Sequence, residues 1–220
     1  MGKSQEFFAA IQKGDTSTVK ALLDTEPSLA GAKNEQGQSA VLTSIYNRRN
    51  EIRDLLLARG VTLELHEAAA AGKLERVKEI VGARPELAKN YSPDGFPVFA
   101  LAAVFGNRDV AEYLFEQGAD VNAAATNPTG YNALTGAVAS GHKELVEWLL
   151  ANGANANYRY SAGFSPLLTA AANGHLEIMK MLLDHGADLC AASNDGKNAL
   201  AYATERKHAA VVDFLNSRGL

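Results

Sequence analysis

The side chains in this sequence that could bind a metal or carry out catalysis recur at a fixed spacing. His142, His175 and His208 follow one another at intervals of 33 residues, each directly before a segment with a helical apolar pattern. Equal positions in adjacent helical repeats lie about 10 Å apart, the usual packing distance between helices. Zinc ligands must approach the ion to about 2 Å, so these histidines cannot share one metal ion. We therefore expect a structural role for all three.

The remaining nucleophilic and acid–base groups form no catalytic set. His66 and His185 have no carboxylate or cysteine partner at ligand spacing, and Cys190 has no Cys–His arrangement around it. Glu64 and Glu67 are three residues apart on an amphipathic segment, which is typical of a solvated helix face. No serine lies in a Gly-x-Ser-x-Gly turn. We expect no catalytic residue, no cofactor and no metal, and hence a protein that is not an enzyme.

Composition and charge exclude further classes of protein. The chain has 220 residues, of which 47% are hydrophobic, and a formal net charge of -4 at pH 7. Such a chain can bury a core, which argues against disorder. The acidic balance argues against a broad nucleic-acid surface, because that affinity depends on Lys and Arg. No stretch has the length of a membrane span, and the single cysteine needs no oxidising compartment, so we predict a cytoplasmic protein that binds neither nucleic acid nor membrane.

An internal repeat organises the whole sequence. The segments Gly118-Ala-Asp-Val-Asn122, Gly153-Ala-Asn-Ala-Asn157 and Gly186-Ala-Asp-Leu-Cys190 recur at 35 and 33 residues. Each follows a run such as Trp148-Leu-Leu150, whose apolar residues fit one face of a helix. A fixed period of this length is typical of stacked repeats. We predict seven units, each with a turn, a short Ala-rich helix, a second turn and a second, amphipathic helix. The turn between the two helices is expected at Gly14, Arg48, Gly72, Gly106, Gly141, Gly174 and Lys207.

The best-preserved copy resembles the ankyrin repeat. Ser165-Pro-Leu-Leu-Thr-Ala-Ala-Ala-Asn-Gly-His175, followed by Leu182-Leu-Asp-His-Gly-Ala-Asp188, is similar to the family's Thr-Pro-Leu-His-x-Ala, Gly-His, Leu-Leu and Gly-Ala-Asp consensus. The resemblance covers essentially the whole chain. It implies an all-α solenoid of stacked helix-turn-helix units with short β-hairpin fingers, and a function in binding rather than catalysis. The consensus histidine is kept only at His66.

One irregularity interrupts the period. Only 12 residues separate Gly60 from Gly72, whereas a regular copy needs about 21 by the 33-residue period. The finger between units 2 and 3 should therefore be missing. We predict a single domain over residues 1–220, one continuous stack with a notch in its row of fingers. Its units are expected at approximately 1–33, 34–62, 63–90, 91–123, 124–157, 158–190 and 191–220.

The row of residues directly after the turn glycines is aromatic in three consecutive units, at Phe96, Tyr131 and Phe164. Exposed aromatic side chains are enriched in binding hot spots. On the expected concave side, made of fingers and first helices, Phe96, Phe105 and Tyr131 could form one pocket. The predicted partner-binding residues are Tyr46, Phe96, Phe105, Tyr131, Tyr160, Phe164 and Lys197.

These features predict a monomeric, non-enzymatic module that holds a protein or peptide partner by aromatic anchors framed with acidic and amide groups. Three alternatives stay open. The aromatic row could simply brace one finger against the next. The chain could be a structural or oligomerising module. A small-molecule or enzymatic site could lie at the notch, where the sequence offers Glu64, His66 and Glu67.

Overall fold

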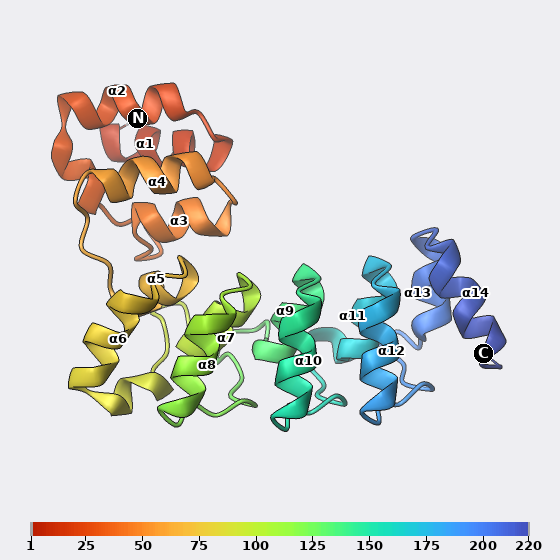
Figure 1. Ribbon diagram of the computed structural model, residues 1–220. Coiled ribbons are helices and arrows are strands. Elements are labelled where there is room, and N and C mark those ends of the chain that lie inside the picture. The colour runs from red at the N-terminus through yellow and green to blue at the C-terminus, as the bar shows by residue number, and fades with distance from the viewer. Residues whose placement is uncertain (1, 220) are drawn as a thin grey trace.

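The computed structural model describes residues 2–219, and over these residues the chain is all-α, as predicted. Seven helix pairs follow one another along the chain (Figure 1). The pairs are α1 (Lys3–Lys13) with α2 (Thr16–Thr25), α3 (Ala40–Tyr46) with α4 (Asn50–Ala58), α5 (Leu65–Ala70) with α6 (Leu74–Ala83), α7 (Val98–Val104) with α8 (Arg108–Glu116), α9 (Ala133–Ser140) with α10 (Lys143–Ala151), α11 (Pro166–Asn173) with α12 (Leu176–Asp184), and α13 (Ala199–Glu205) with α14 (Ala209–Ser217). Three short 3-10 helices lie between pairs: η1 (Pro27–Gly31), η2 (Pro85–Lys89) and η3 (Ser161–Gly163).

The first helix of most pairs begins at a polar cap and is built from small residues. Ser39 and Asn132 each accept a hydrogen bond from the backbone N–H three residues later, at 3.1 and 2.9 Å, which satisfies an otherwise unpaired donor of the first turn. Many alanine side chains on these helices, such as Ala69, Ala102 and Ala170, are fully buried and allow close approach between units. The approach is closest at Gly136 of α9, where an added Cβ would run into Val104 of α7.

The second helices are amphipathic and fill the layer behind the first. Leu149 of α10 and Leu182 of α12 are fully buried, while carboxylates occupy the first turns, as at Glu144 and Glu177. The helix dipole favours negative charge at that end. The buried residues of all pairs join into one hydrophobic core that runs the length of the molecule.

The predicted fingers are present as single antiparallel bridges rather than strands in the described residues. The bridges are Lys33 with Ser39, Tyr91 with Pro97, Ala124 with Asn132, Tyr160 with Phe164, and Ala192 with Asn198. No bridge lies within residues 59–64, which connect α4 to α5. Each finger leads directly into a first helix, so a side chain at its tip lies beside the start of that helix.

The row of pairs changes direction at residues 59–64, a bend that the repeat spacing did not predict. Figure 1 shows the pairs from α5/α6 to α13/α14 side by side in a row, with α1–α4 lying across one end of it. Elsewhere the residue before the second helix reaches back to the preceding unit: Asn107 Nδ2 donates to the Ala69 and Ala70 carbonyls at 2.8 and 2.9 Å. The same position before α6 is Lys73, which makes no such bond within the described chain. The bend thus falls where the regular tie between units is missing.

No helix in residues 2–219 combines the length and the apolar character that crossing a bilayer requires.

Candidate functional site

Two hollows that share Tyr131 lie on the surface formed by the fingers and the first helices. We name them the proximal pocket, with a volume of ≈ 430 Å³, and the distal pocket, with a volume of ≈ 530 Å³. The proximal pocket is lined by Tyr46, Arg48, Phe96, Leu101, Val104, Phe105, Tyr131, Ser140 and His142. The distal pocket is lined by Pro128, Thr129, Tyr131, Ala139, Tyr160, Ser161, Ala162, Phe164, Thr169, Ala172, Asn173, Tyr202 and Arg206.

Six of the seven predicted site residues line these pockets. Phe96, Phe105 and Tyr131 lie in one hollow, together with Tyr46. Tyr131 also lines the distal pocket with Tyr160 and Phe164. All six side chains are half-buried, so each ring rests on the core and presents its remaining surface to solvent. The sequence identified these aromatic residues but not their division between two pockets.

A hydrogen-bonded finger turn fixes Phe96 at the mouth of the proximal pocket. The Ser92 hydroxyl accepts from the Phe96 N–H at 3.0 Å and donates to the Asp94 carboxylate at 2.5 Å. Gly95 at the turn has φ 84, a left-handed conformation that glycine adopts without strain. The residue after the turn glycine is therefore held in a fixed place by its own finger.

Tyr46 closes the proximal pocket from the other side of the bend. Its ring stacks on Phe105 with centroids 5.9 Å apart and an interplanar angle of 13°. Its hydroxyl donates to the Asp94 carboxylate at 2.8 Å. Burial, aided by the neighbouring Asp94 charge, raises the pKa of Tyr46 well above its usual value, so the hydroxyl stays a donor. Tyr46 thus both lines the pocket and joins α3 to unit 4.

The distal pocket is walled by a chain of aromatic rings. The ring centroids of Tyr131 and Tyr160 lie 5.1 Å apart in an edge-to-face arrangement. The next centroid distances are 6.2 Å from Tyr160 to Phe164 and 4.9 Å from Phe164 to Tyr202. Burial raises the pKa of Tyr160 to about 12, and its hydroxyl is hydrogen-bonded to Thr169. Edge-to-face and offset pairs of this kind stabilise one another. The bracing expected under the first alternative therefore exists, and the same rings also line a hollow.

Tyr202 is the lining residue that sequence reasoning missed. It lies on α13 rather than in the row after the turn glycines, and only stacking of the units brings it beside Phe164. Its hydroxyl is hydrogen-bonded to Ser193 at 2.9 Å. A tyrosine within an otherwise Ala-rich first helix was the available signal.

Lys197, the seventh predicted residue, lies outside both linings. Its ammonium pairs with Glu205 at 2.7 Å and lies 5.8 Å from the centre of the Tyr202 ring. The hydrogen bond to Glu205 raises the pKa of Lys197. The structure therefore gives Lys197 an intramolecular partner.

The charged side chains that line the pockets are basic, not acidic as expected. Arg48 lines the proximal pocket and Arg206 the distal one, whereas no Asp or Glu lines either. The nearest acids are committed elsewhere: Asp94 accepts from Tyr46, and Glu205 pairs with Lys197. One amide side chain, Asn173, lines the distal pocket, and its Nδ2 donates to the Ala139 carbonyl at 3.2 Å.

The recurring histidines face backbone carbonyls of the preceding unit. His142 Nε2 lies 3.1 Å from the Val104 carbonyl, and His208 Nε2 lies 3.0 Å from the Ala172 carbonyl. Burial lowers the pKa of His175, with a hydrogen bond to the Ala139 carbonyl acting in the opposite direction. Among residues 2–219 no group of three or more His, Cys, Asp or Glu is placed to hold a metal ion. These rings tie the first helices α7, α9 and α11 to the unit that follows each of them.

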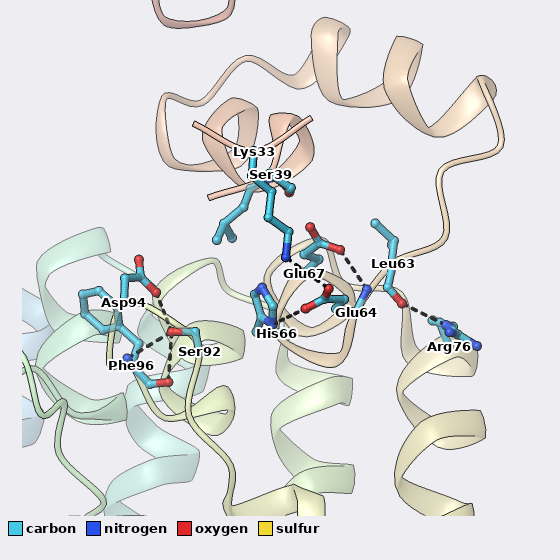
Figure 2. A network of polar contacts seen from close by, with 11 residues as sticks. Lys33, Ser39, Leu63, Glu64, His66, Glu67, Arg76, Ser92, Asp94 and Phe96 are labelled. Carbon is cyan, nitrogen blue, oxygen red and sulfur yellow. Dashed lines mark hydrogen bonds and ion pairs between the residues drawn. The ribbon is translucent and has the colours of Figure 1, made fainter. Parts of the chain in front are cut away.

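The polar residues at the notch are engaged with one another. A hollow of ≈ 580 Å³ lies here, lined in part by Glu64, His66 and Arg76. Figure 2 shows Lys33 reaching across the bend to Glu64 at 3.5 Å, with His66 beside the same carboxylate at 3.7 Å. Glu67, only 4% exposed, accepts from the Glu64 N–H at 2.8 Å and so closes the first turn of α5. Arg76 donates to the Leu63 carbonyl at 3.1 Å. These bonds explain the residues as supports of the bend.

The comparisons with known proteins agree with this repeat geometry. The family described as Ankyrin repeats (3 copies) matches residues 65–160 and 137–220, well over half of the chain. The chain belongs to the ankyrin repeat family. The matched part begins at Leu65, where α5 begins, while α1–α4 repeat the same helix-pair design outside it. Members of the ankyrin family are generally protein-interaction modules.

A rat protein, Ankyrin repeat and SAM domain-containing protein 6, is 39% identical over 128 residues. The aligned part covers 58% of this chain and 12% of that protein. The chain therefore corresponds to a small part of the rat protein, and the similarity lies in ankyrin repeats.

Proposed function

We propose that this ankyrin protein is a non-enzymatic interaction module that binds a protein or peptide partner in the proximal and distal pockets. The observation that supports it most is the meeting of aromatic side chains from several units in two adjoining hollows, with Tyr131 between them. Half-buried rings held by fingers, as Phe96 is, or by the ends of first helices, as Phe105 is, supply contact area at little cost in conformational entropy. The family's general use in protein binding agrees with this assignment.

A triple variant tests the proposal in the cell that makes the protein. Phe96→Ala, Phe105→Ala and Tyr131→Ala together remove three of the proximal rings, and we expect the variant to lose a partner that the native chain captures. The matched control is Tyr91→Ala, because Tyr91 is the exposed aromatic residue of a finger, 44% exposed, and lines neither pocket. Thermal unfolding should show that the triple variant stays folded. Undiminished capture by the folded variant would reject the proposal.

The structural alternative predicts self-association, and we propose that the chain acts as a monomer. On the side of the second helices, the Trp148 ring packs against Phe115 and Phe99, with ring centroids 5.4 and 6.5 Å apart. These contacts account for the Trp148 ring within the fold. Sedimentation equilibrium should give the mass of one chain. A dimer that Trp148→Ala disrupts would instead favour the oligomerising module.

The single cysteine supports a reducing, cytoplasmic compartment as the place where this binding occurs. Cys190 is exposed and free, and exposed thiols persist where thiol reductants are abundant. Fractionation of the source cell tests this location, and recovery of the protein outside the cytoplasm would contradict it.

A further inference from the structure

Resting on the proposed function, we infer that the partner is an extended peptide segment with two large apolar side chains, one for each pocket. An acidic residue of the peptide lies next to the apolar residue that occupies the distal pocket. The first part of this inference comes from the number and placement of the hollows. Phe96 and Phe105 of unit 4 contribute to the proximal pocket, and Phe164 and Tyr202 of units 6 and 7 to the distal one. Tyr131 of unit 5 separates them, so one side chain of the partner cannot fill both.

The spacing of the two apolar side chains follows from the repeat. The proximal lining comes mainly from units 4 and 5 and the distal lining mainly from unit 6. The two anchor positions are therefore about one and a half units apart, which is roughly 15 Å at the usual helix-packing distance of about 10 Å per unit. An extended chain advances about 3.3 Å per residue, so the two anchors should be four or five residues apart. A helical partner would need roughly ten residues to span the same distance.

The polar groups among the aromatic rings favour an extended main chain. Ser140 in the proximal pocket and Ser161 in the distal one offer hydroxyl groups at the surface of the hollows, and Asn173 offers its amide oxygen, since its Nδ2 donates to the Ala139 carbonyl at 3.2 Å. An extended peptide has unpaired backbone N–H and C=O groups that these side chains can bond, whereas the backbone groups of a helix are already satisfied.

The acidic residue follows from the charge of the linings. Arg206 is exposed in the distal pocket, and within residues 2–219 its guanidinium forms no ion pair. Glu205, its neighbour in sequence, is held by Lys197 at 2.7 Å. The site is therefore locally positive although the whole chain carries a net charge of -4. Charge complementarity assigns a carboxylate to the partner at this point.

The test uses random peptides displayed on phage and selected on the full-length chain. Selected peptides should share two aromatic or large aliphatic residues four or five positions apart, with Asp or Glu beside one of them. A synthetic copy of the most enriched peptide is then titrated against variants by fluorescence polarisation. Tyr131→Ala should weaken binding at least about tenfold, because a central aromatic hot spot is lost. Tyr91→Ala should leave it unchanged.

Charge reversal tests the acidic residue separately. Arg206→Glu should weaken the peptide about fivefold, since an exposed pair contributes up to about 1 kcal/mol, and should improve binding of the same peptide with Lys in place of its acid. Lys143→Glu, an identical charge change at an exposed site outside both linings, should have no effect.

The phage selection and the titrations of the variants separate failure of this inference from failure of the proposed function. If no peptide is enriched, this inference fails, and the proposed function is decided by the triple variant alone. If the enriched peptide binds the Tyr131→Ala variant as tightly as the native chain, the proposed function and this inference both fail. If binding depends on Tyr131 but not on the sign of the charge at position 206, the proposed function stands. The inference of an acidic residue in the peptide is then wrong. If the anchors lie about ten residues apart, the extended conformation is overturned.

Discussion

At the scale of single residues, the exit loops are linked by a ladder of asparagines. Asn122 Nδ2 donates to the Gly153 carbonyl at 3.1 Å and its Oδ1 accepts from the Asn155 N–H at 2.8 Å. One unit later, Asn157 makes the same two bonds to Gly186 and Asp188, each at 2.8 Å. Cys190 occupies the following position, and its side chain forms no hydrogen bond within residues 2–219. The residue type thus changes where the ladder ends.

This ladder predicts unequal effects for two similar truncations. Asn157→Ala should lower the free energy of unfolding by about 1 kcal/mol, because it removes two exposed hydrogen bonds between units. Cys190→Ala should change it by less than about 0.5 kcal/mol, as is usual for surface positions without such bonds. Urea denaturation measures both. Equal effects would show that the ladder does not stabilise the stack.

The residue at the turn between paired helices is fixed by its neighbour in the next unit. Gly174 has φ 73, and an added Cβ would lie 2.6 Å from His208 Nδ1. Arg48 and Lys207 adopt the same left-handed conformation without being glycine, at φ 55 and 60. Among residues 2–219 no helix pair follows the turn at Lys207, and the residue that would face Arg48 is Lys73, which makes no hydrogen bond to the preceding unit. Gly174 must therefore both adopt a left-handed backbone conformation and leave room for His208, whereas Lys207 must meet only the backbone requirement.

Gly174→Ala should lower the free energy of unfolding by about 2 kcal/mol, from backbone strain and the clash with His208. Lys207→Gly should raise the free energy of unfolding by roughly 1 kcal/mol, since glycine adopts the left-handed backbone conformation without strain. Lys207→Ala removes the same charge and should give no gain. Denaturant titration measures the free energy of unfolding of the three variants. A Lys207→Ala variant more stable than the native chain would contradict the explanation by backbone strain.

At the scale of elements, the residue at the start of most second helices ties that helix to the unit before it, as Asn107, His142 and His208 do. In unit 6 this residue is His175, whose pKa burial lowers in the folded state. The folded chain therefore resists protonation at this site more than the unfolded chain does. The stability that depends on neutral His175 is complete above the unfolded pKa of about 6.5, and it is lost as the pH falls below that value and through the lowered pKa of the folded state.

His175→Asn isolates this effect, because Asn107 makes the corresponding tie in unit 4 with a side chain that does not titrate. Between pH 7 and pH 5.5 the native chain should lose more free energy of unfolding than the variant, as measured by urea denaturation at both pH values. Comparison of the two losses cancels the carboxylates, which titrate identically in both proteins. Equal losses would contradict a shifted His175.

The sequence predicted the helix pairs well and the candidate site only in part, for physical reasons. Helix pairs depend on local periodicity and on turn residues that repeat. The grouping of Phe96, Phe105 and Tyr131 followed from stacking alone. Tyr46 joins them through the bend, and Tyr202 through the last pair, and both contacts depend on how units sit on each other. The hydrogen-bond partner of Asp94 and the ion-pair partner of Glu205 also became clear only in three dimensions.

At the scale of the whole molecule, α1–α4 and α5–α14 meet across a junction that differs from the other contacts between units. Lys33 pairs with Glu64 at 3.5 Å, Tyr46 donates to Asp94 at 2.8 Å, and no finger bridge lies in the connection. In repeat proteins each unit is stabilised mainly by its neighbours, so a weaker contact permits separate unfolding on either side of it.

Hydrogen exchange should therefore show α1–α4 opening together, with less protection than α9–α12. Tyr46→Phe should widen the difference by about tenfold in exchange rate, because a bond to a carboxylate of roughly 1.5 kcal/mol is lost across the junction. Uniform protection along the chain, unchanged by Tyr46→Phe, would show that the bend is as strong as the regular contacts.

Site-specific photo-crosslinking tests most directly the central claim that the wall between the two pockets contacts a partner. Benzoylphenylalanine can replace Tyr131, and in a second protein Tyr91, with an aromatic ring kept at each position. On irradiation in the source cell, the proposed binding mode predicts a crosslinked partner from position 131 and none from position 91. A partner that crosslinks at position 91 but not at position 131 would contradict it.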